Sequence, residues 1–335
     1  MAKDGPVSDS NAPVVVVGGG ISGITCARTL VRAGHTVRVL DRGRRLGGRM
    51  AVRTEALVSG KHAVDVGASY FTVRDERFAA VVDGWQQAGL ARPWTDTFHL
   101  AGPDGRLGTT TGLPRWAAAG GLRSLVENLA EGLDVTSQHE VEEVDVEGVR
   151  LLVDGEPARA VVLAMPDPQA ADLLPEPVST WLGLDGGREW SPVIAVWAAW
   201  GERWWGDLDG AFVDGSPVVS WLADDGRRRG DDAPVLVAHA TSVFAAGRLE
   251  DPGTATAPVL AEVARLLGAD GFPEPEFARA HRWSLAAPMH PHRAPFGLHP
   301  ALVGVCGDAW GDRPRVEQAF LSGLQLGEAL AERLG

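Results

Sequence analysis

Three glycines and one aspartate near the N-terminus have the types and spacing of a nucleotide-binding turn. Gly18, Gly20 and Gly23 form the pattern Gly-x-Gly-x-x-Gly, and Asp41 follows at the end of the next apolar run. The first glycine permits a tight turn, the second lets the backbone approach a pyrophosphate, and the third lets a helix pack closely on a strand. Free N–H groups at that helix start bind phosphate, and a carboxylate after the second strand accepts ribose hydroxyls. These residues predict a dinucleotide site.

The residues around these glycines predict the elements that must position them. The β-branched run 13–17 is typical of a parallel strand buried on both faces. Apolar residues recur at helical spacing over 24–31 before Gly34, and the run 35–40 predicts a second strand. Because strand, turn, helix, strand and acid occur in the required order, we interpret the pattern as a ligand site rather than as a bare strand–helix turn.

Composition and charge limit the class of protein. The chain has 335 residues, of which 45% are hydrophobic and 22% are charged, typical of a globular protein with room for two domains. The net charge of -13 argues against nucleic acid and anionic membranes as partners. The N-terminus lacks the apolar core of a signal peptide and no window could span a bilayer, so we expect a cytoplasmic protein. Cys26 and Cys306 have no zinc-ligand or disulfide-framework spacing, and no metal site is predicted.

Two further glycine motifs indicate which dinucleotide is bound. The run 46–50, Leu-Gly-Gly-Arg-Met, resembles the second glycine motif of amine-oxidase-like FAD proteins, where NAD dehydrogenases usually enter a helix. Gly307 and Asp308 end the apolar run 302–306 and precede a predicted helix over 316–334. In that superfamily such a pair contacts the ribityl or pyrophosphate region. The helix that follows directs its positive end at the flavin.

Longer runs resemble renalase and its bacterial relatives, the renalase-like NAD(P)/FAD-dependent oxidoreductases of the flavin amine oxidase superfamily. The similarity extends from about residue 13 to residue 333, and one departure is Gln318, where the family tends to have glycine. A side chain at that position could narrow the space beside the flavin. The runs that carry the resemblance are 65–72, 120–122, 164–166, 220–223, 239–240, 281–286, 304–310 and 315–323.

The resemblance implies an α/β fold in which a glutathione-reductase-like, FAD-binding Rossmann domain carries an inserted mixed α+β substrate domain. It also implies that FAD is bound non-covalently. We expect a disordered tail over 1–12, an FAD-binding domain from 13–75, 117–167 and 281–335, and a substrate domain from 76–116 and 168–280. The expected cofactor-binding residues are Gly18, Gly20, Ile21, Ser22, Gly23, Asp41, Arg42, Gly48, Arg49, Met50, Gly67, Ala68, Ser69, Val141, Gly307, Asp308, Val316, Glu317 and Ala319.

Other segments are predicted from periodicity alone. The runs 134–138, 141–146, 149–153 and 158–164 alternate like a β-meander. The composition of 91–116 favours strands and loops. Helices are predicted near 76–89, 122–130, 169–184 and 255–268, and strands near 192–200, 211–213, 218–223 and 234–241.

The resemblance also implies a reaction. Renalase-like enzymes oxidise misreduced isomers of dihydronicotinamide cofactors and pass the electrons through FAD to O2, which gives hydrogen peroxide. Such hydride removal needs position, desolvation and electrostatics rather than a general base, so no catalytic residue is assigned. The partners expected are a small-molecule substrate and O2. The pocket candidates are Tyr70, Trp221, His239, Trp283 and Trp310.

Oxidation of an amine or another carbon–nitrogen bond in a biosynthetic pathway is the alternative. Many FAD amine oxidases carry a lysine near the flavin and two aromatics, often tyrosines, around the amine. Lysine occurs only at Lys3 and Lys61, neither in the expected substrate domain, and tyrosine occurs only at Tyr70. A cage of two tyrosines is therefore impossible, although tryptophans could supply ring faces. This scarcity favours the dihydronicotinamide substrate.

Four features have both a functional and a structural interpretation. The run 227–229, three arginines, could meet a substrate phosphate, but a solvated turn is favoured. His290 and His292 have ligand-like spacing without further ligands nearby. The pair 204–205, two tryptophans, is expected to pack a core, and His239 fits substrate contact or a hydrogen-bonded core position equally well.

Overall fold

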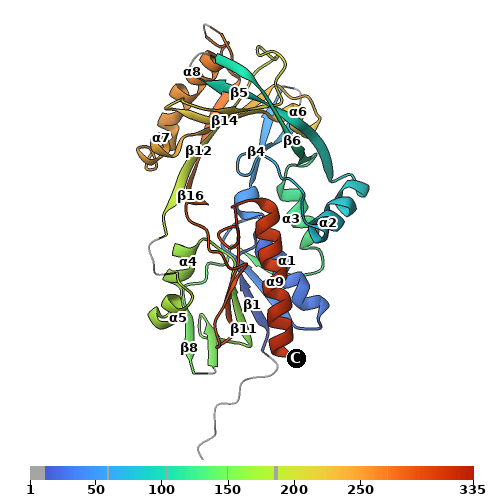
Figure 1. The fold of residues 1–335 in the computed structure, drawn as a ribbon, viewed down its shortest axis with the longest axis vertical. Helices are drawn as coiled ribbons and strands as arrows, with labels where there is room; N and C mark the ends of the chain where they lie inside the picture. The colour runs from blue at the N-terminus through green and yellow to red at the C-terminus, as the bar shows by residue number, and fades with distance from the viewer. Residues whose placement is uncertain (1–11, 59, 103–104, 149, 185–187, 270) are drawn as a thin grey trace, which may run out of the picture. The chain divides into compact units, whose positions relative to one another are not determined.

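The computed structural model describes residues 12–58, 60–102, 105–148, 150–184, 188–269 and 271–335, without the side chains of residues 106 and 107. The predicted tail over 1–12 lies outside the described residues except for Ala12. The chain forms two compact units (Figure 1). Unit 1 consists of the described parts of Met1–Gly48, Val126–Glu189 and Ala287–Gly335, and unit 2 consists of those of Arg49–Leu125 and Trp190–Ala286.

Unit 1 is built on a six-stranded sheet in the order β17-β18-β11-β1-β2-β7. The pairs from β18 to β7 are parallel, and β17 adds an antiparallel edge. Every residue of β1 and β11 is buried, as expected for strands covered on both faces. The strands are β1 (Val14–Val17), β2 (Val37–Asp41), β7 (Asp134–Ser137), β11 (Ala160–Leu163), β17 (Gly297–Leu298) and β18 (Val303–Val305).

Two helices of unit 1 lie against each other because glycines remove the side chains between them. Helix α1 (Ile21–Arg32) follows β1 directly, and α9 (Val316–Leu334) ends the chain. A Cβ atom on Gly323 of α9 would lie 2.0 Å from the Ser22 carbonyl oxygen of α1. A Cβ atom on Gly327 would lie 2.8 Å from the Thr29 side chain. The backbone of α9 therefore sits directly on α1.

The predicted four-stranded β-meander is wrong. The first run forms β7, which pairs in parallel with β2, and the last forms β11, a central strand of the six-stranded sheet. Only β8 (Val144–Glu147), β9 (Arg150–Val153) and β10 (Glu156–Ala158) form an antiparallel sheet. The uniformly apolar run at 160–163 carried the signal of a doubly covered strand and was misread as part of an alternating one.

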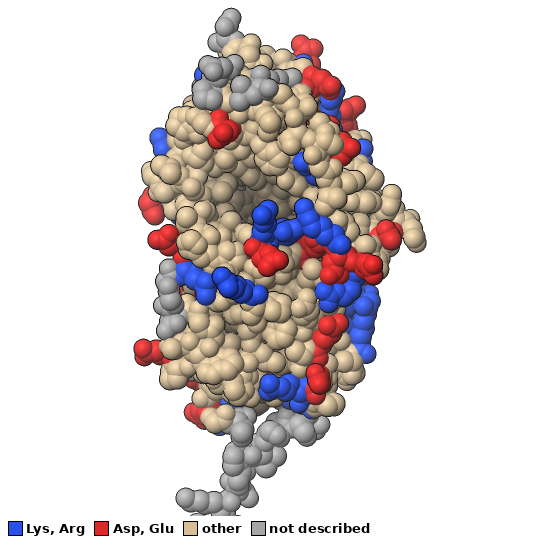
Figure 2. Space-filling view, viewed as in Figure 1, with Lys and Arg blue, Asp and Glu red and all other residues tan. Residues whose placement is uncertain are grey.

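The rest of unit 1 consists of two short helices, α4 (Asp167–Asp172) and α5 (Glu176–Trp181). Both lie in the segment that we expected in the substrate domain, which shows that the expected boundary at residue 167 differs from the observed one at Glu189. Among the described residues, no helix is both long and apolar enough to cross a membrane. Acidic and basic side chains are interspersed over the face shown in Figure 2.

Unit 2 is built on a seven-stranded sheet in the order β16-β12-β15-β14-β13-β5-β6. The β13–β5 pair is parallel, and the pairs β12–β15, β15–β14, β14–β13 and β5–β6 are antiparallel. The segment 91–116, for which strands and loops were expected, lies in the long β5–β6 hairpin. The strands are β5 (Ala91–Gly102), β6 (Gly105–Ala118), β12 (Trp190–Ala199), β13 (Gly210–Val213), β14 (Val219–Asp224), β15 (Val235–Ala240) and β16 (Phe277–Pro288).

Alternate residues of β12 enter two different cores of unit 2, as period-two geometry requires. Ile194, Val196 and Ala198 pack in the core that contains the apolar face of α8 (Thr256–Leu266). Their neighbours Ala195 and Trp197 pack in the core formed with the hairpin of β3 (Val52–Leu57) and β4 (Gly60–Asp65). The remaining elements of unit 2 include α2 (Glu76–Gln87), α6 (Asp225–Arg229), α7 (Ser242–Ala246) and η2 (Pro252–Ala255), and α3 (Arg123–Leu129) begins in unit 2 and ends in unit 1.

The observed units also differ from the expected domains at three other places, one of which is 117–125, a segment that belongs to unit 2. The segment 49–75 belongs to unit 2, where its hairpin packs under the seven-stranded sheet. Residues 281–286 belong to β16, the edge strand of that sheet, rather than to the dinucleotide-binding segments. Sequence periodicity did not reveal either pairing because both depend on strands far away in the chain.

The α1–α9 contact predicts opposite effects of the same substitution at two helical glycines. Gly323→Ala should destabilise the protein by about 1–3 kcal/mol, since the added methyl group meets backbone that cannot move freely. Gly84→Ala, in the exposed middle of α2 with open space around it, should stabilise the protein by about 0.5–1 kcal/mol. Urea unfolding measures both, and equal effects of the two substitutions would contradict the packing described.

Candidate functional site

Of the three motif glycines in the turn after β1, two are packed against other backbone and one, Gly20, borders open space. A Cβ atom on Gly18, whose φ is +110°, would lie 2.5 Å from the Ala164 carbonyl oxygen. One on Gly23 would lie 2.0 Å from the Gly18 carbonyl oxygen. One on Gly20 would meet no described atom within 4 Å. Gly18 and Gly23 are therefore required by packing, whereas the space in front of Gly20 is free for a ligand.

The start of α1 offers unblocked backbone donors beside that space. Gly20 is the N-cap residue and has no side chain that could bond to the first turn. The first-turn residues Ile21, Ser22 and Gly23 are buried, and the turn carries no acidic residue. An N-terminus without a cap and without a negative charge attracts a phosphate group.

The Asp41 carboxylate holds the glycine turn in place. It accepts hydrogen bonds from the backbone N–H groups of Gly19 at 2.6 Å and of Gly43 at 2.7 Å. A carboxylate has about four acceptor positions, so it retains capacity for ribose hydroxyls. Arg42 next to it is exposed and lies 3.5 Å from Glu140.

The second glycine motif lies against the first. The N–H group of Gly47 donates to the Gly19 carbonyl at 2.9 Å. Gly48 has a φ of +51°, and a Cβ atom on it would lie 3.6 Å from the Gly20 Cα atom. The two motifs that the sequence predicted to bind one dinucleotide are thus adjacent.

Arg49, by contrast, contacts residues of unit 2. Its guanidinium donates to the Ala286 carbonyl at 3.1 Å and lies 5.2 Å from the Trp190 ring. Its own carbonyl accepts from Ala68 at 2.8 Å, and a Cβ atom on Gly67 would lie 2.0 Å from it. The predicted residues at 49 and 67–69, with buried Met50, therefore form one backbone cluster.

Gly307 and Asp308, also predicted to bind the cofactor, lie in unit 1 directly after β18. The Gly307 N–H group donates to the Ser322 hydroxyl of α9 at 3.0 Å, and Asp308 follows. Arg315, the N-cap residue of α9, has no side-chain cap on the first turn, where Val316 and Glu317 are buried. The Gln318 amide donates to the Trp310 carbonyl at 2.7 Å, so the side chain that departs from the family pattern lies on that loop.

Trp310 packs on His292, one of the two histidines whose spacing alone resembles that of metal ligands. The rings of His292 and Trp310 stack with centroids 3.7 Å apart, and His292 Nε2 lies 2.8 Å from an oxygen of buried Asp167. Among the described residues no group of three His, Cys, Asp or Glu side chains could hold a metal ion. The histidine instead fixes the loop that carries Trp310. Of the remaining expected cofactor residues, Val141 is buried and Ala319 lies half-buried on α9.

Unit 2 contains a cluster of five aromatic side chains, here called the aromatic cluster. Its members are Tyr70, Trp94, Phe98, Phe212 and Trp221. The Tyr70 ring centroid lies 5.4 Å from that of Phe98 and 5.7 Å from that of Trp221. Sequence analysis proposed Tyr70 and Trp221 but missed the other three, because pairing of β5 with β13 brings them together.

Arg115 carries a buried positive charge at the aromatic cluster. Its guanidinium carbon lies 3.9 Å from the Phe98 ring centroid, and the residue is 7% exposed. It donates to the Asp96 backbone carbonyl, and no carboxylate among the described residues forms an ion pair with it. Burial raises the pKa of the Tyr70 hydroxyl, and the Arg115 charge opposes that rise. Sequence analysis missed Arg115 since nothing local distinguishes it from a surface arginine.

His239 lies beside the aromatic cluster, opposite Trp221 in the β14–β15 pair. Burial, reinforced by the charge of Arg228, lowers its pKa to about 4, so the ring is neutral at pH 7. Its Nε2 atom and the indole N–H groups of Trp94 and Trp221 are buried without a hydrogen-bond partner in the described part of the chain. The hydrogen-bonded core position expected for His239 is therefore not observed at Nε2.

The solvated turn predicted for 227–229 is wrong for two of its three arginines. Arg228 is fully buried and pairs with Asp225, and Arg229 also pairs with Asp225 at 2.8 Å. Asp225 pairs with both of these buried arginines, and Asp231 is a second partner of Arg229, which local charge counting does not reveal. Of the three, only Arg227 is partly exposed.

Arg228 joins α6 to the loop that carries Tyr70. It donates to the Ser69 carbonyl at 2.9 Å and to the Asp65 carbonyl at 3.2 Å. Burial raises the pKa of Asp65 to about 6 against the opposing charge of Arg228, and Asp65 accepts from the Leu122 N–H group at 2.7 Å. Trp283, another predicted pocket residue, donates to the Val66 carbonyl at 2.8 Å and lies against His281 rather than in the aromatic cluster.

Comparison with models of known protein families identifies the family to which the chain belongs. Residues 16–85 match the model of the NAD(P)-binding Rossmann-like domain, and residues 98–323 match that of the flavin containing amine oxidoreductases. The second match spans most of the chain. The chain belongs to the flavin containing amine oxidoreductase family. Its fold is mixed α/β with a Rossmann-like domain.

Individual relatives match over shorter segments. The chain is 38% identical over 91 residues to (S)-6-hydroxynicotine oxidase of Paenarthrobacter nicotinovorans, covering 27% of this chain and 21% of that protein. It is 36% identical over 99 residues to putrescine oxidase of Kocuria rosea, covering 30% and 20%. The matched segments thus span about a fifth of these relatives. Cyclohexylamine oxidase of Brevibacterium oxydans shares the fold, with a TM-score of 0.73, 14% identity and coverage of 97% of this chain and 99% of that one.

Membership of the flavin family makes the space beside Gly20 testable as a cofactor cradle. Gly20→Val should leave the unfolding free energy of the flavin-free protein within about 1 kcal/mol of the parent, since a Cβ atom at this position meets no described atom within 4 Å. It should weaken FAD binding at least about tenfold, because the isopropyl group occupies the space beside the phosphate donors. Flavin absorbance and fluorescence titration measure this.

Gly23→Val is the matched control for that experiment. Its Cβ atom would meet the Gly18 carbonyl oxygen, so it should destabilise the protein with or without FAD. A Gly20→Val protein that binds FAD as tightly as the parent would contradict the placement of the phosphates at this turn.

The lowered pKa of His239 predicts a pH dependence of stability. The unfolded histidine takes up a proton near pH 6.5, whereas the folded one does so only near pH 4. The unfolded state thus binds more protons between these values, and stability is lost as the pH falls from 6.5 towards 4. His239→Gln should reduce that slope by up to about 1.4 kcal/mol per pH unit. Urea unfolding at several pH values measures it, and an unchanged slope would show that His239 is not held neutral.

Proposed function

We propose that this protein is an FAD-dependent oxidase that removes hydride from a carbon bonded to nitrogen, in a small molecule that reacts in its neutral form. The observation that carries the proposal is the buried charge of Arg115 at the aromatic cluster, without a carboxylate partner among the described residues. Aromatic faces alone would attract an ammonium group. The adjacent guanidinium opposes that attraction by Coulomb repulsion.

A neutral nitrogen is what this chemistry needs. Bound FAD would supply the hydride acceptor for the substrate carbon, and O2 would be the final electron acceptor, giving hydrogen peroxide. The nitrogen lone pair assists the departure of hydride, and a protonated nitrogen has no such lone pair. Arg115 favours the neutral form by lowering the pKa of a bound amine. The aromatic rings of Tyr70, Phe98 and Trp221 would supply an apolar surface that excludes water from the substrate.

Small amines are the substrate class that we favour. The relatives are named as oxidases of putrescine, cyclohexylamine and (S)-6-hydroxynicotine, all of which contain a carbon–nitrogen bond that such an enzyme could oxidise. The only lysine in the described part of the chain, Lys61, is exposed at the start of β4. The proposed reaction therefore depends on Arg115 and the aromatic surface rather than on a buried lysine.

A dihydronicotinamide isomer, the substrate of renalase-like enzymes, is the second candidate. Its ring nitrogen is neutral and drives hydride loss as the ring becomes aromatic. Its phosphates carry negative charge, which the uncompensated charge of Arg115 would attract. The unpartnered indole N–H groups of Trp94 and Trp221 could donate to a carboxamide oxygen.

FAD would be held by unit 1 in the glutathione-reductase-like manner, with unit 2 as the substrate domain. Phosphates would lie at Gly20 and the first turn of α1, the ribose at Asp41, and the ribityl region at Asp308. The attachment would be non-covalent. Both cysteines are buried, and burial raises the pKa of the Cys26 and Cys306 thiols, the latter to about 12, so neither is a reactive thiolate.

Anaerobic reduction of the holoenzyme tests the reaction. Putrescine, cyclohexylamine and chemically prepared dihydronicotinamide isomers would be mixed separately with FAD-loaded protein, and the flavin absorbance followed. Bleaching by an amine, followed by peroxide formation on admission of O2, is the expected result. Bleaching by the dihydronicotinamides alone would select the second candidate. A protein that cannot be loaded with FAD would overturn the proposal.

Arg115→Gln tests the neutral-substrate step. Removing the buried charge should raise the apparent pKa of the bound amine, read from the pH dependence of kcat, by about one unit. Arg77→Gln is the control, because Arg77 is exposed and pairs with Asp75 on α2. A pH profile of the Arg115→Gln variant that coincides with that of the parent enzyme would rule out electrostatic control by Arg115.

A further inference from the structure

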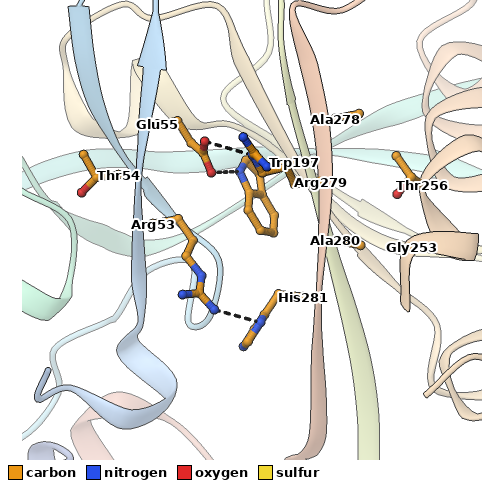
Figure 3. Close-up of a pocket in the computed structure, with 10 residues that line it drawn as sticks. All are labelled: Arg53, Thr54, Glu55, Trp197, Gly253, Thr256, Ala278, Arg279, Ala280 and His281. Atoms are coloured by element: carbon orange, nitrogen blue, oxygen red, sulfur yellow. Dashed lines mark hydrogen bonds and ion pairs between the residues drawn. The ribbon is translucent and has the colours of Figure 1, made fainter. Parts of the chain in front are cut away.

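A polar pocket of about 810 Å³ lies in unit 2, apart from the aromatic cluster. Its walls come from β3, from the edge strand β16 with its neighbour Trp197, and from the η2–α8 junction (Figure 3). None of the proposed flavin-binding or aromatic-cluster residues lines it. This pocket, here called the β3–β16 pocket, has no role in the function proposed above.

The charges in the β3–β16 pocket do not cancel. Glu55 is buried, accepts from the Trp197 indole at 3.0 Å with one oxygen and from Arg279 at 3.1 Å with the other. The charges of Glu55 and Arg279 thereby compensate each other. The Arg53 guanidinium lies 3.1 Å from Nδ1 of His281, and no carboxylate among the described residues pairs with it. One positive charge remains inside a protein whose net charge is -13.

The His281 ring does not compensate the positive charge of Arg53. Arg53 has only donors, so Nδ1 of His281 must accept, and the proton of the neutral ring is then on Nε2. Burial and the charge of Arg53 lower the pKa of His281 to about 4, in agreement with a neutral ring. Figure 3 shows Arg53 and His281 directed towards each other across the pocket from β3 and β16. Both therefore present N–H donors.

We infer that the β3–β16 pocket binds a small organic anion through its carboxylate or phosphate group. The planar fork of Arg53 matches two oxygens of such a group, and one of its nitrogens is already oriented by His281. Thr256 also lines the pocket and adds a hydroxyl donor, whereas the Thr54 side chain lies on the other side of β3 from Arg53 in Figure 3. The volume suits a ligand larger than a bare ion.

Isothermal titration of the FAD-loaded enzyme with pyrophosphate and with succinate tests the site. Loading with FAD keeps the dinucleotide site occupied, so added anions report on other positions. Saturable binding of pyrophosphate alone would identify a phosphate ligand, and of succinate alone a carboxylate ligand. Absence of saturable binding by either probe at low ionic strength would overturn the inference.

Arg53→Gln should weaken anion binding roughly tenfold or more, since it removes the positive charge and the paired N–H donors of the guanidinium. Arg282→Gln is the matched control, because Arg282 follows His281 on β16 but is exposed and donates to the Leu249 carbonyl. Thr256→Val, which leaves the Arg53–His281 contact intact, should weaken binding by a smaller factor and serves if Arg53→Gln misfolds. Binding that is unaffected by Arg53→Gln and Thr256→Val would place the anion elsewhere. The titration does not depend on whether the proposed oxidation is found.

Discussion

The buried ion pairs of Arg228 hold the candidate substrate surface of unit 2 together. Arg228 is the largest fully buried side chain among the described residues, and its charge is compensated by Asp225 and Asp65. Its guanidinium also binds the carbonyls of residues 65 and 69, which fixes the loop that ends at Tyr70. Removing one partner of such a pair typically costs about 3–5 kcal/mol, because the other charge stays buried.

This interaction explains why charged residues dominate a region that looks like a surface turn in the sequence. Asp65 also accepts from Leu122, so β4, α6 and the segment that leads into α3 meet at one carboxylate. The nearby Arg115 differs from Arg228 in having no carboxylate partner in the described part of the chain. The charge of Arg228 is thus compensated by carboxylates and serves the fold, whereas Arg115 leaves a net positive charge at the aromatic cluster. That difference is the physical basis of the proposed preference for a neutral substrate.

Local patterns predicted the dinucleotide-binding half well. The strand, glycine turn, helix and acid at 14–41 all form as expected, since each depends on neighbours in the chain. The same holds for the packing of Trp204 and Trp205, which join Trp200 in the core of unit 2. Tyr70 and Trp221 were found through family resemblance rather than periodicity.

Features that depend on distant pairing could not be predicted. Trp94 and Phe98 reach Trp221 only because β5 pairs with β13, and β16 joins the seven-stranded sheet from the far end of the chain. The burial of Arg228 and the isolation of Arg115 have no local signature, since both look like ordinary charged residues in sequence. The role of Gly323 could not be predicted either. A side chain at this position is excluded only because α9 packs directly on α1, which is far away in the chain.

The central claim is that hydride leaves a carbon bonded to nitrogen. Stopped-flow measurement of anaerobic flavin reduction, with a reactive substrate deuterated at that carbon, tests it most directly. The account predicts slower reduction with deuterium at that position than with hydrogen. Equal rates for the two, together with slower reduction when deuterium is placed at another carbon of the same substrate, would contradict it.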